Sequence, residues 1–322
     1  MINKPVYIVI INWNNSRDTI ECIDSVLKIN YPDYKIILVD NNSEDDSLEK
    51  IKNWIVDKNI YFAEYDRMLN KIKDTENLRE IKIIIIRNNY NAGFAGGSNL
   101  GIKFALKDNV DYVWLLNNDT VVEKNSLIEM VKLAEFDSKI GIIGSKLMSY
   151  YEKNKIQDIG GWLTLSSYIT GKYYGHDTVD KEEYNKIIEP DYIKGASMLI
   201  NLNLIKDIGL MDEDYFLYWE ETDYCIRAKK NHWRLYYCPT SIVWHKEGAT
   251  TKKGSKITVY YYTRNSLIFY KRFFPIQFLV IFVFGLLFKI LKRLIKKDAY
   301  SIKYIVKAYI DFVFHRYGRA EL

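Results

Sequence analysis

Val6-Tyr7-Ile8-Val9-Ile10-Ile11 is an apolar, β-branched run that ends in Asn12-Trp13-Asn14-Asn15. A run of this length without polar alternation is typical of a parallel strand that is covered on both faces. The same pattern predicts strands at residues 36–39, 82–86 and 112–116. Because helical periodicity separates these strands, the sequence predicts an α/β fold with an open, mostly parallel sheet and helices on both faces.

Composition narrows the functional class. The chain has 322 residues, of which 48% are hydrophobic and 27% are charged, so general disorder is excluded. A net charge of +5 is too small to argue for a nucleic-acid partner, and we expect none. The three cysteines lack metal-type spacing and no signal peptide opens the chain, so we expect reduced thiols in a cytoplasmic protein.

Two segments of different character follow one another. Residues 1–265 are predicted to form one catalytic domain, with residues 57–80 as an exposed, partly helical insertion. Residues 266–322 carry a different, C-terminal helical pattern. Further strands of the catalytic domain are expected at residues 140–143, 197–200, 235–237 and 242–244.

The carboxyl ends of the four predicted strands are polar. In open parallel sheets, ligands bind outside these ends. The four segments that follow the strands are Asn12-Trp13-Asn14, Asp40-Asn41-Asn42, Asn88-Asn89-Tyr90-Asn91 and Asn117-Asn118-Asp119. Four polar ends in register along one sheet edge favour a ligand site over ordinary polar loops.

Two features of this edge could serve a nucleotide, and each has a structural alternative. Asp40 could accept hydrogen bonds from a ribose or a base, or it could form an Asx turn or a helix cap. The small residues between Asn91 and Asn99 suit a phosphate or sugar cradle, or equally tight packing of a helix on the sheet. They do not form the G-x-G-x-x-G dinucleotide motif.

Asp119 and His245 are the candidates for a metal site. Asp119 ends a strongly apolar strand, where a carboxylate is well placed to hold a divalent cation against a diphosphate. His245 ends another apolar strand, although a lone histidine at such a position is more often structural. Only the fold can bring the two side chains together.

Residues 211–227 mix carboxylates with aromatic side chains, as sugar-binding sites do. If a helix begins near Glu220, then Glu220, Asp223 and Arg227 share one face. Asp223 and Arg227 would then form an i, i+4 ion pair, which is the structural explanation for Asp223. Glu221 lies about 100° from that face and is the freest to act as a general base.

Eight short motifs in order give the sequence a family resemblance. They are Ile11–Asn14, Val39–Ser43, Asn91–Asn99, Leu116–Thr120, Lys194–Met198, Gly209–Glu213, Tyr218–Asp223 and Val243–Lys246. In these residues the chain resembles a family 2 glycosyltransferase of GT-A fold, closest to the rhamnosyltransferase-like branch.

The resemblance implies an inverting hexosyltransferase that moves a sugar from a nucleoside-diphosphate donor to a hydroxyl of a glycan or polyprenyl-linked glycan in cell-surface polysaccharide synthesis. The expected donor is dTDP-rhamnose, and the alternative is a UDP-sugar of galactose, galactofuranose or GlcNAc. It implies that Asp119 and His245 bind Mn²⁺ or Mg²⁺. The catalytic base is expected at Glu221, with Glu220 and Asp223 as alternatives.

The remaining expected site residues fall into two groups. The nucleotide and donor group is Asn12, Asn14, Asp40, Asn91, Gly93, Gly97, Asn99 and Asn118. The acceptor and sugar pocket group is Gly195, Ala196 and Trp219.

The C-terminal segment suggests membrane attachment. Residues 273–288 are uncharged, but about 16 helical residues span only about 24 Å, less than the roughly 30 Å of a bilayer core. Residues 290–297 continue as a basic amphipathic helix suited to anionic lipid. We therefore expect a peripheral protein on the inner face of the cell membrane. The alternative is a buried helix pair or an oligomer interface, such as that of a homodimer.

Two other functions compete with the transferase. A sugar nucleotidyltransferase would carry a glycine-rich basic loop after the first strand, which Asn12-Trp13-Asn14-Asn15 does not supply. An inactive membrane scaffold would have no need of Asp119, Glu221 and His245.

Overall fold

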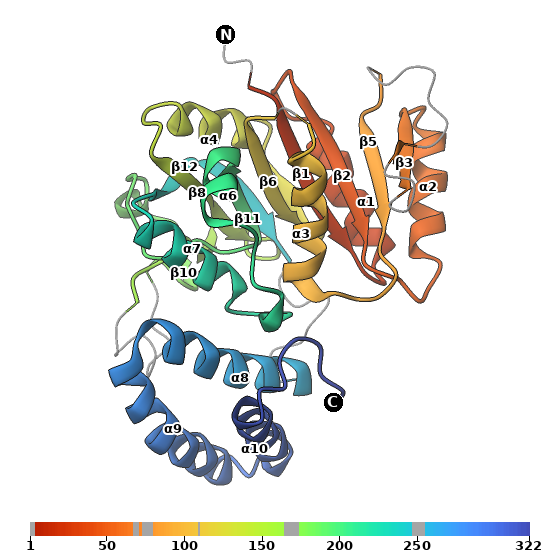
Figure 1. The fold of residues 1–322 in the computed structure, drawn as a ribbon. Helices are drawn as coiled ribbons and strands as arrows, with labels where there is room; N and C mark the ends of the chain where they lie inside the picture. The colour runs from red at the N-terminus through yellow and green to blue at the C-terminus, as the bar shows by residue number, and fades with distance from the viewer. Residues whose placement is uncertain (1–3, 67–70, 73–79, 109, 164–173, 247–254) are drawn as a thin grey trace.

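A large mixed sheet forms the centre of the molecule (Figure 1). The computed structural model describes residues 4–66, 71–72, 80–108, 110–163, 174–246 and 255–322. The strands follow one another in space as β10-β9-β8-β11-β6-β1-β2-β5-β3-β4, and β12 pairs with β7 and β8.

Parallel strands build the N-terminal half of the sheet. They are β1 (Val6–Asn12), β2 (Tyr34–Asp40), β5 (Ile83–Arg87) and β6 (Tyr112–Asn117), and all four predicted strands are confirmed. Asn12 lies beside Asp40 in the register of β1 and β2, and Ile11 lies beside Asn117 of β6. The polar ends of these strands therefore meet at one edge, as the sequence predicts.

Helices cover both faces of the sheet. One face packs against α1 (Ser16–Val26), α2 (Ser47–Asp57) and α4 (Ser126–Ala134). The other face packs against α3 (Gly93–Ala105), α6 (Leu202–Ile208) and α7 (Glu220–Lys230). Alternation along β1 sends Ile8 to the first layer and Val9 to the second, and both side chains are buried. Each such side chain stabilises the fold by roughly 1.5–3 kcal/mol.

The second half of the sheet is mixed. Its strands are β7 (Thr120–Val122), β8 (Ile140–Ser149), β9 (Lys155–Asp158), β10 (Thr178–Val179), β11 (Ser197–Asn201) and β12 (Arg234–His245). β11 runs antiparallel to both β6 and β8. Residues 235–237 and 242–244, predicted as two strands, belong to the single strand β12, because a register shift between Cys238 and Ile242 absorbs the interruption.

The described part of residues 57–80 corrects the expected insertion. Residue 57 ends α2, and β3 (Phe62–Asp66) then pairs in parallel with β5. β4 (Lys71–Ile72) pairs with β3. The described residues of this segment therefore extend the sheet with β3 and β4 and form no helix of their own, and Ala63 of β3 is buried in the core. Residues 67–70 and 73–79 lie outside the described residues.

Three C-terminal helices lie beneath the sheet domain (Figure 1). They are α8 (Lys256–Phe273), α9 (Pro275–Ile295) and α10 (Ala299–Val313). Their side chains form a third core, which also takes in Tyr215 and Trp219 from the loop before α7. Residue 265, the predicted division between the two segments, lies inside α8. Across the residues that the structure describes, none of the helices combines the length and apolarity needed to cross a membrane.

Candidate active site

A cavity of about 1310 Å³ lies between the carboxyl edge of the sheet and the C-terminal helices. Predicted site residues from five parts of the chain line it: Asn91 and Gly93, Asn118 and Asp119, Gly195 and Ala196, Glu220 and Glu221, and His245. The fold therefore gathers most of the predicted residues around one space.

A buried hydrogen-bond network lies under the sheet edge. Asn12 Nδ2 donates to Asp40 Oδ1 at 3.0 Å, and Thr19 Oγ1 donates to Asn12 Oδ1 at 2.7 Å. Asn118 Nδ2 in turn donates to Thr19 Oγ1 at 2.9 Å. The network fixes the relative positions of β1, β2 and β6, and Asn12 and Asp40 support the cavity without lining it.

Asp40 also organises the loop that follows β2. Ser43 donates its hydroxyl to Asp40 Oδ1 at 2.6 Å and its backbone N–H to Oδ2 at 3.3 Å. Asp40 thus has the kind of structural role that the sequence left open, although the N–H it binds lies three residues on and not two, as in an Asx turn. Asn14 binds the same loop, because its N–H donates to Ser43 Oγ and its side chain accepts from the N–H of Glu44.

The start of α3 forms the next wall of the cavity. Gly93 has φ +69°, and a Cβ there would lie 2.1 Å from the carbonyl oxygen of Phe216. Only glycine fits this left-handed, crowded position. Asn91 Oδ1 accepts from the N–H of Gly93 at 2.9 Å and from Asn41 Nδ2 at 3.1 Å.

Further along α3, two residues that were predicted to bind the sugar donor, Gly97 and Asn99, have packing roles. Gly97 lies against Ile11, and a Cβ there would approach that side chain to 3.0 Å. Asn99 is buried and holds the loop after α6, since it donates to the carbonyl of Met211 and to Glu213 Oε1. Neither Gly97 nor Asn99 lines the cavity.

Asp119 and His245 meet at the sheet edge. His245 Nε2 lies 3.1 Å from Asp119 Oδ1, because β12 and β7 pair and bring the two strand ends together. The other ring nitrogen, Nδ1, lies 2.6 Å from Gln157 Oε1, which fixes the plane of the imidazole. Burial alone would raise the pKa of Asp119, but His245, a backbone hydrogen bond and the charge of Lys246 together hold that pKa below its usual value.

This pair fits a divalent cation that also binds a diphosphate. Two ligands at right angles around Mg²⁺, each about 2.1 Å away, lie about 3.0 Å apart, close to the observed separation. A carboxylate and an imidazole suit Mn²⁺ or Mg²⁺, and substrate phosphates and waters commonly complete the coordination. Within the described ranges, no group of three or more His, Cys, Asp and Glu side chains could supply a complete protein cage.

Glu220 and Glu221 open α7 at the opposite side of the cavity. The Oε2 atoms of both side chains are buried, and neither finds a hydrogen-bond partner among the residues described here. Burial raises the pKa of both carboxyls, and the Glu221 charge raises that of Glu220 further. Glu221 lies against Gly195, since a Cβ there would come within 3.6 Å of Glu221 Cβ. A desolvated carboxylate with a raised pKa is suited to accept a proton.

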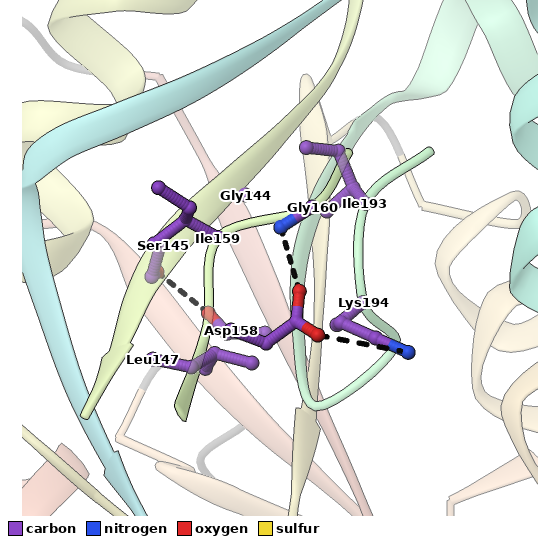
Figure 2. A pocket seen from close by; sticks show the side chains of 9 residues that line it. Gly144, Ser145, Leu147, Asp158, Ile159, Gly160, Ile193 and Lys194 are labelled. Carbon is purple, nitrogen blue, oxygen red and sulfur yellow. Dashed lines mark hydrogen bonds and ion pairs between the residues drawn. The ribbon is translucent and has the colours of Figure 1, made fainter. Parts of the chain in front are cut away.

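Lys194, Asp158 and His176 complete this side of the cavity, and the sequence analysis did not identify them. Figure 2 shows Lys194 reaching the carboxylate of Asp158, which also accepts the N–H of Gly160. Lys194 Nζ lies 3.8 Å from Asp158 Oδ2, and His176 Nδ1 lies 3.5 Å from the same oxygen. The charge of Lys194 lowers the pKa of Glu221 against the larger effect of burial. In the sequence, the Lys194–Met198 motif was the feature that could have pointed to Lys194 as a site residue.

Asp223 does not face the cavity. Arg227 Nε donates to its Oδ1 at 2.7 Å, and Arg272 Nη1 and the Tyr215 hydroxyl donate to its Oδ2 at 2.6 and 3.0 Å. The side chain is fully buried. With its oxygens engaged by two guanidinium groups, Asp223 holds α7 in place, and the predicted ion pair with Arg227 is present.

Trp219 is likewise part of the core and does not line the cavity. Its ring packs 4.9 Å from Phe269 and 5.8 Å from Tyr270, measured between ring centroids. The aromatic lining includes instead Phe94, Phe216, Tyr218, Tyr261, Tyr262 and Trp13, together with Phe284 and Phe288 of α9. Trp219 instead joins the core formed with the C-terminal helices.

The loop before α7 is strained and is held from α8. Phe216, Tyr218 and Trp219 all have positive φ, which costs of order 1–3 kcal/mol for each such residue. Asn265 Nδ2 donates to the carbonyls of Tyr215, Leu217 and Tyr218 at 2.7–2.8 Å. The sequence contained no motif for this anchor, since it joins residues far apart in the chain.

Comparison with known proteins agrees with this geometry. The sequence model of the family described as "Glycosyltransferase like family 2" matches residues 4–264. The low-salt glycan biosynthesis hexosyltransferase Agl10 of Haloferax volcanii is 26% identical over 183 residues, which are 55% of this chain and 57% of the relative. Rhamnosyltransferase WbbL of Escherichia coli is 24% identical over 155 residues, which are 46% of this chain and 58% of the relative. The matches therefore span little more than half of these two relatives.

A longer match and a solved structure add to the comparison. An uncharacterized glycosyltransferase of Haemophilus influenzae is 24% identical over 97% of this chain and 92% of its own length. The structure of GalNAc-T7 with UDP, GalNAc and Mn²⁺ superposes with a TM-score of 0.56 at 17% identity, covering 81% of this chain and 47% of that one. That superposition agrees with the predicted GT-A fold. Since the family model covers most of the chain, including Asp119, Glu220, Glu221 and His245, the predicted resemblance is confirmed, and the chain belongs to glycosyltransferase family 2.

Proposed function

We propose that this chain transfers a hexose, with inversion and with the help of Mn²⁺ or Mg²⁺, from a nucleoside-diphosphate sugar to a hydroxyl of a glycan acceptor. The observation that carries the proposal is that the Asp119–His245 pair and Glu221 line one cavity. A candidate cation site and a buried carboxylate whose Oε2 has no hydrogen-bond partner face a common space, and these are the two parts that such a transfer needs.

Each part has a separate task. When bound, the cation supplies positive charge to the leaving diphosphate. Asp119 and His245 would hold that cation at the sheet edge. Glu221 accepts the proton of the acceptor hydroxyl as its oxygen attacks the anomeric carbon from the side opposite the diphosphate. Lys194 keeps Glu221 sufficiently ionised to act, because its charge opposes the effect of burial.

For the donor we propose dTDP-rhamnose, with UDP-sugars as the alternative. The similarity to rhamnosyltransferase WbbL supports rhamnose, while the similarity to galactofuranosyltransferase GlfT2 of Mycobacterium tuberculosis, 20% identical over 192 residues, supports a UDP-sugar. The rings of Trp13 and Phe94 line the cavity and suit a base or sugar face.

We also propose that the chain attaches to the inner face of a membrane through α9. Ten large apolar side chains of this helix are more than a third exposed: Ile276, Leu279, Val280, Val283, Phe284, Leu287, Phe288, Leu291, Leu294 and Ile295. An apolar surface of this extent marks an interaction site. Basic residues lie on the opposite face of α9. Anionic lipid therefore fits both the apolar face and the basic residues.

A donor screen tests the proposed transfer. The purified chain is incubated with Mn²⁺ and a panel of dTDP- and UDP-sugars, and release of the nucleoside diphosphate is measured. One donor should be consumed, and Asp119→Ala should abolish Mn²⁺-dependent binding of its nucleoside diphosphate in calorimetry. Lys132→Gln, on the exposed side of α4, is the control. Unchanged affinity of Asp119→Ala in Mn²⁺ would remove the metal role.

A further inference from the structure

The active-site cavity continues onto α9. Beyond the catalytic residues it is lined by Val280, Ile281, Phe284, Gly285 and Phe288 of that helix. Phe284 and Phe288 are more than half exposed, so one apolar wall runs from the site of transfer to the outer face of the molecule. A ligand that lies in this passage has an apolar part at its outer end.

The two ends of the same cavity carry side chains of opposite charge. Its side-chain carboxylates, namely Asp119, Asp158, Glu220 and Glu221, all lie at the end of the proposed transfer site. The charged side chains that line the other end are all cationic: Lys256, Lys289, Lys292, Arg293 and Arg319. An anionic group of the ligand is therefore expected near α9, away from the donor diphosphate.

Three of these cations share one face of α9. At 100° per residue, Lys289, Lys292 and Arg293 fall within an arc of about 100°, and Leu287, Leu291 and Leu294 lie roughly opposite. Each of these three leucines is more than half exposed. When the leucine face lies in a bilayer, the three cations lie above it, at the depth of the phosphate groups.

The surroundings of Arg293 and Lys289 favour binding of a highly charged anion such as a diphosphate. Arg293 Nη1 is held by Asp298 Oδ2 at 2.8 Å, which orients the guanidinium group at the end of the helix. Lys289 is half-buried, and burial lowers its pKa to about 8. A partly buried ammonium group is stabilised more by an anionic ligand than an exposed ammonium group is.

Resting on the proposed transfer, we propose that Lys289, Lys292 and Arg293 form a subsite for the diphosphate of a lipid-linked acceptor. The lipid chain leaves along Phe284 and Phe288 toward the leucine face of α9. The sugar end of the acceptor then extends toward Glu221. Diphosphate groups at the two ends of the cavity thus have different partners: the Asp119–His245 cation for the donor and α9 for the acceptor.

Direct binding of a simple lipid diphosphate tests this subsite. The full chain in EDTA, which prevents binding through a metal, is titrated calorimetrically with dodecyl diphosphate, dodecyl maltoside or inorganic pyrophosphate. Dodecyl diphosphate should bind at least tenfold more tightly than either comparison ligand, because only it offers both the chain and the charge. Lys289→Gln/Lys292→Gln/Arg293→Gln should weaken that binding at least tenfold.

The control removes the same number of charges elsewhere. Lys296→Gln/Lys297→Gln/Lys303→Gln lies outside the cavity lining and should change the affinity by less than twofold. Equal weakening by both triple variants would mean attraction to a general basic surface, such as anionic headgroups use, and would overturn the subsite. Equal affinity for dodecyl maltoside would overturn it as well. Donor hydrolysis by the unchanged chain in Mn²⁺, measured without lipid, tests the proposed transfer separately.

Discussion

Arg272 of α8 and Asp223 of α7 form a 2.6 Å ion pair that joins the C-terminal helices to the helix that carries Glu221. The same guanidinium group also binds Asp212 at 2.6 Å. Asp223 is fully buried, so it depends on its partners for charge compensation. The proposed catalytic base, Glu221, therefore lies on a helix whose position is set from outside the sheet domain.

Replacing Arg272 should impair both stability and transfer. Arg272→Ala leaves the buried Asp223 with Arg227 as its one cationic partner among the described residues, which should lower the free energy of unfolding by roughly 1–3 kcal/mol. Transfer should fall more than donor binding, because Glu221 lies on the same helix. Denaturant unfolding and steady-state kinetics measure both effects. Lys271→Ala, its neighbour, is the control, and equal losses in the two variants would contradict this role.

The pH dependence of transfer should reflect the ionisation of Glu221. A general base acts when deprotonated, so the rate should rise with pH through the raised pKa of Glu221, above the usual glutamate range. Lys194 lowers that pKa, so Lys194→Gln should move the acid limb of the kcat profile to higher pH. Lys132→Gln removes a distant charge and should leave the limb in place. An acid limb that stays still in Lys194→Gln, or moves to lower pH, would exclude this assignment.

Vesicle sedimentation tests the attachment of α9. The chain should sediment with phosphatidylglycerol vesicles, and moderate salt should weaken binding by screening the basic residues. Leu287→Glu/Leu291→Glu places charges on the exposed apolar face and should reduce binding at least tenfold. Ile187→Glu, an exposed apolar position outside the C-terminal helices, should bind as the unchanged chain does. A salt-independent oligomer that ignores vesicles would show that protein covers α9.

Local patterns in the sequence were sufficient to predict the sheet and the residues along one edge of the site. The apolar run of β1 predicts a strand buried on both faces, and its period sends Ile8 and Val9 to opposite layers. The register of parallel strands then aligns Asn12 with Asp40. Spacing likewise predicts the Asp223–Arg227 pair, because i and i+4 residues meet on any helix.

The remaining parts of the site depend on contacts between distant residues. Trp219 was predicted in the sugar pocket, but it packs against Phe269 and Tyr270 of α8, about 50 residues further along the chain. Asn265 and Arg272 lie about 50 residues from the groups they hold, so no local pattern reveals them. Lys194 and Asp158 meet only after β9 and the segment before β11 come together.

Replacing Glu221 tests the central claim that its carboxylate is the base of a sugar transfer. Glu221→Gln keeps the shape of the side chain and removes its charge. Because burial raises the folded pKa of Glu221, its ionisation opposes folding as pH rises, so Glu221→Gln should not lower the melting temperature at pH 7. Glu220→Gln is the matched control, with the same chemistry one residue away.

The decisive measurement is the single-turnover rate of transfer with donor binding checked by calorimetry. Glu221→Gln should bind the donor in Mn²⁺ as the unchanged chain does and transfer the sugar at least about a hundredfold more slowly, the scale for loss of a general base. Glu220→Gln should retain most of the rate. A Glu221→Gln variant that transfers at the normal rate, or an inactive Glu220→Gln beside an active Glu221→Gln, would contradict the account.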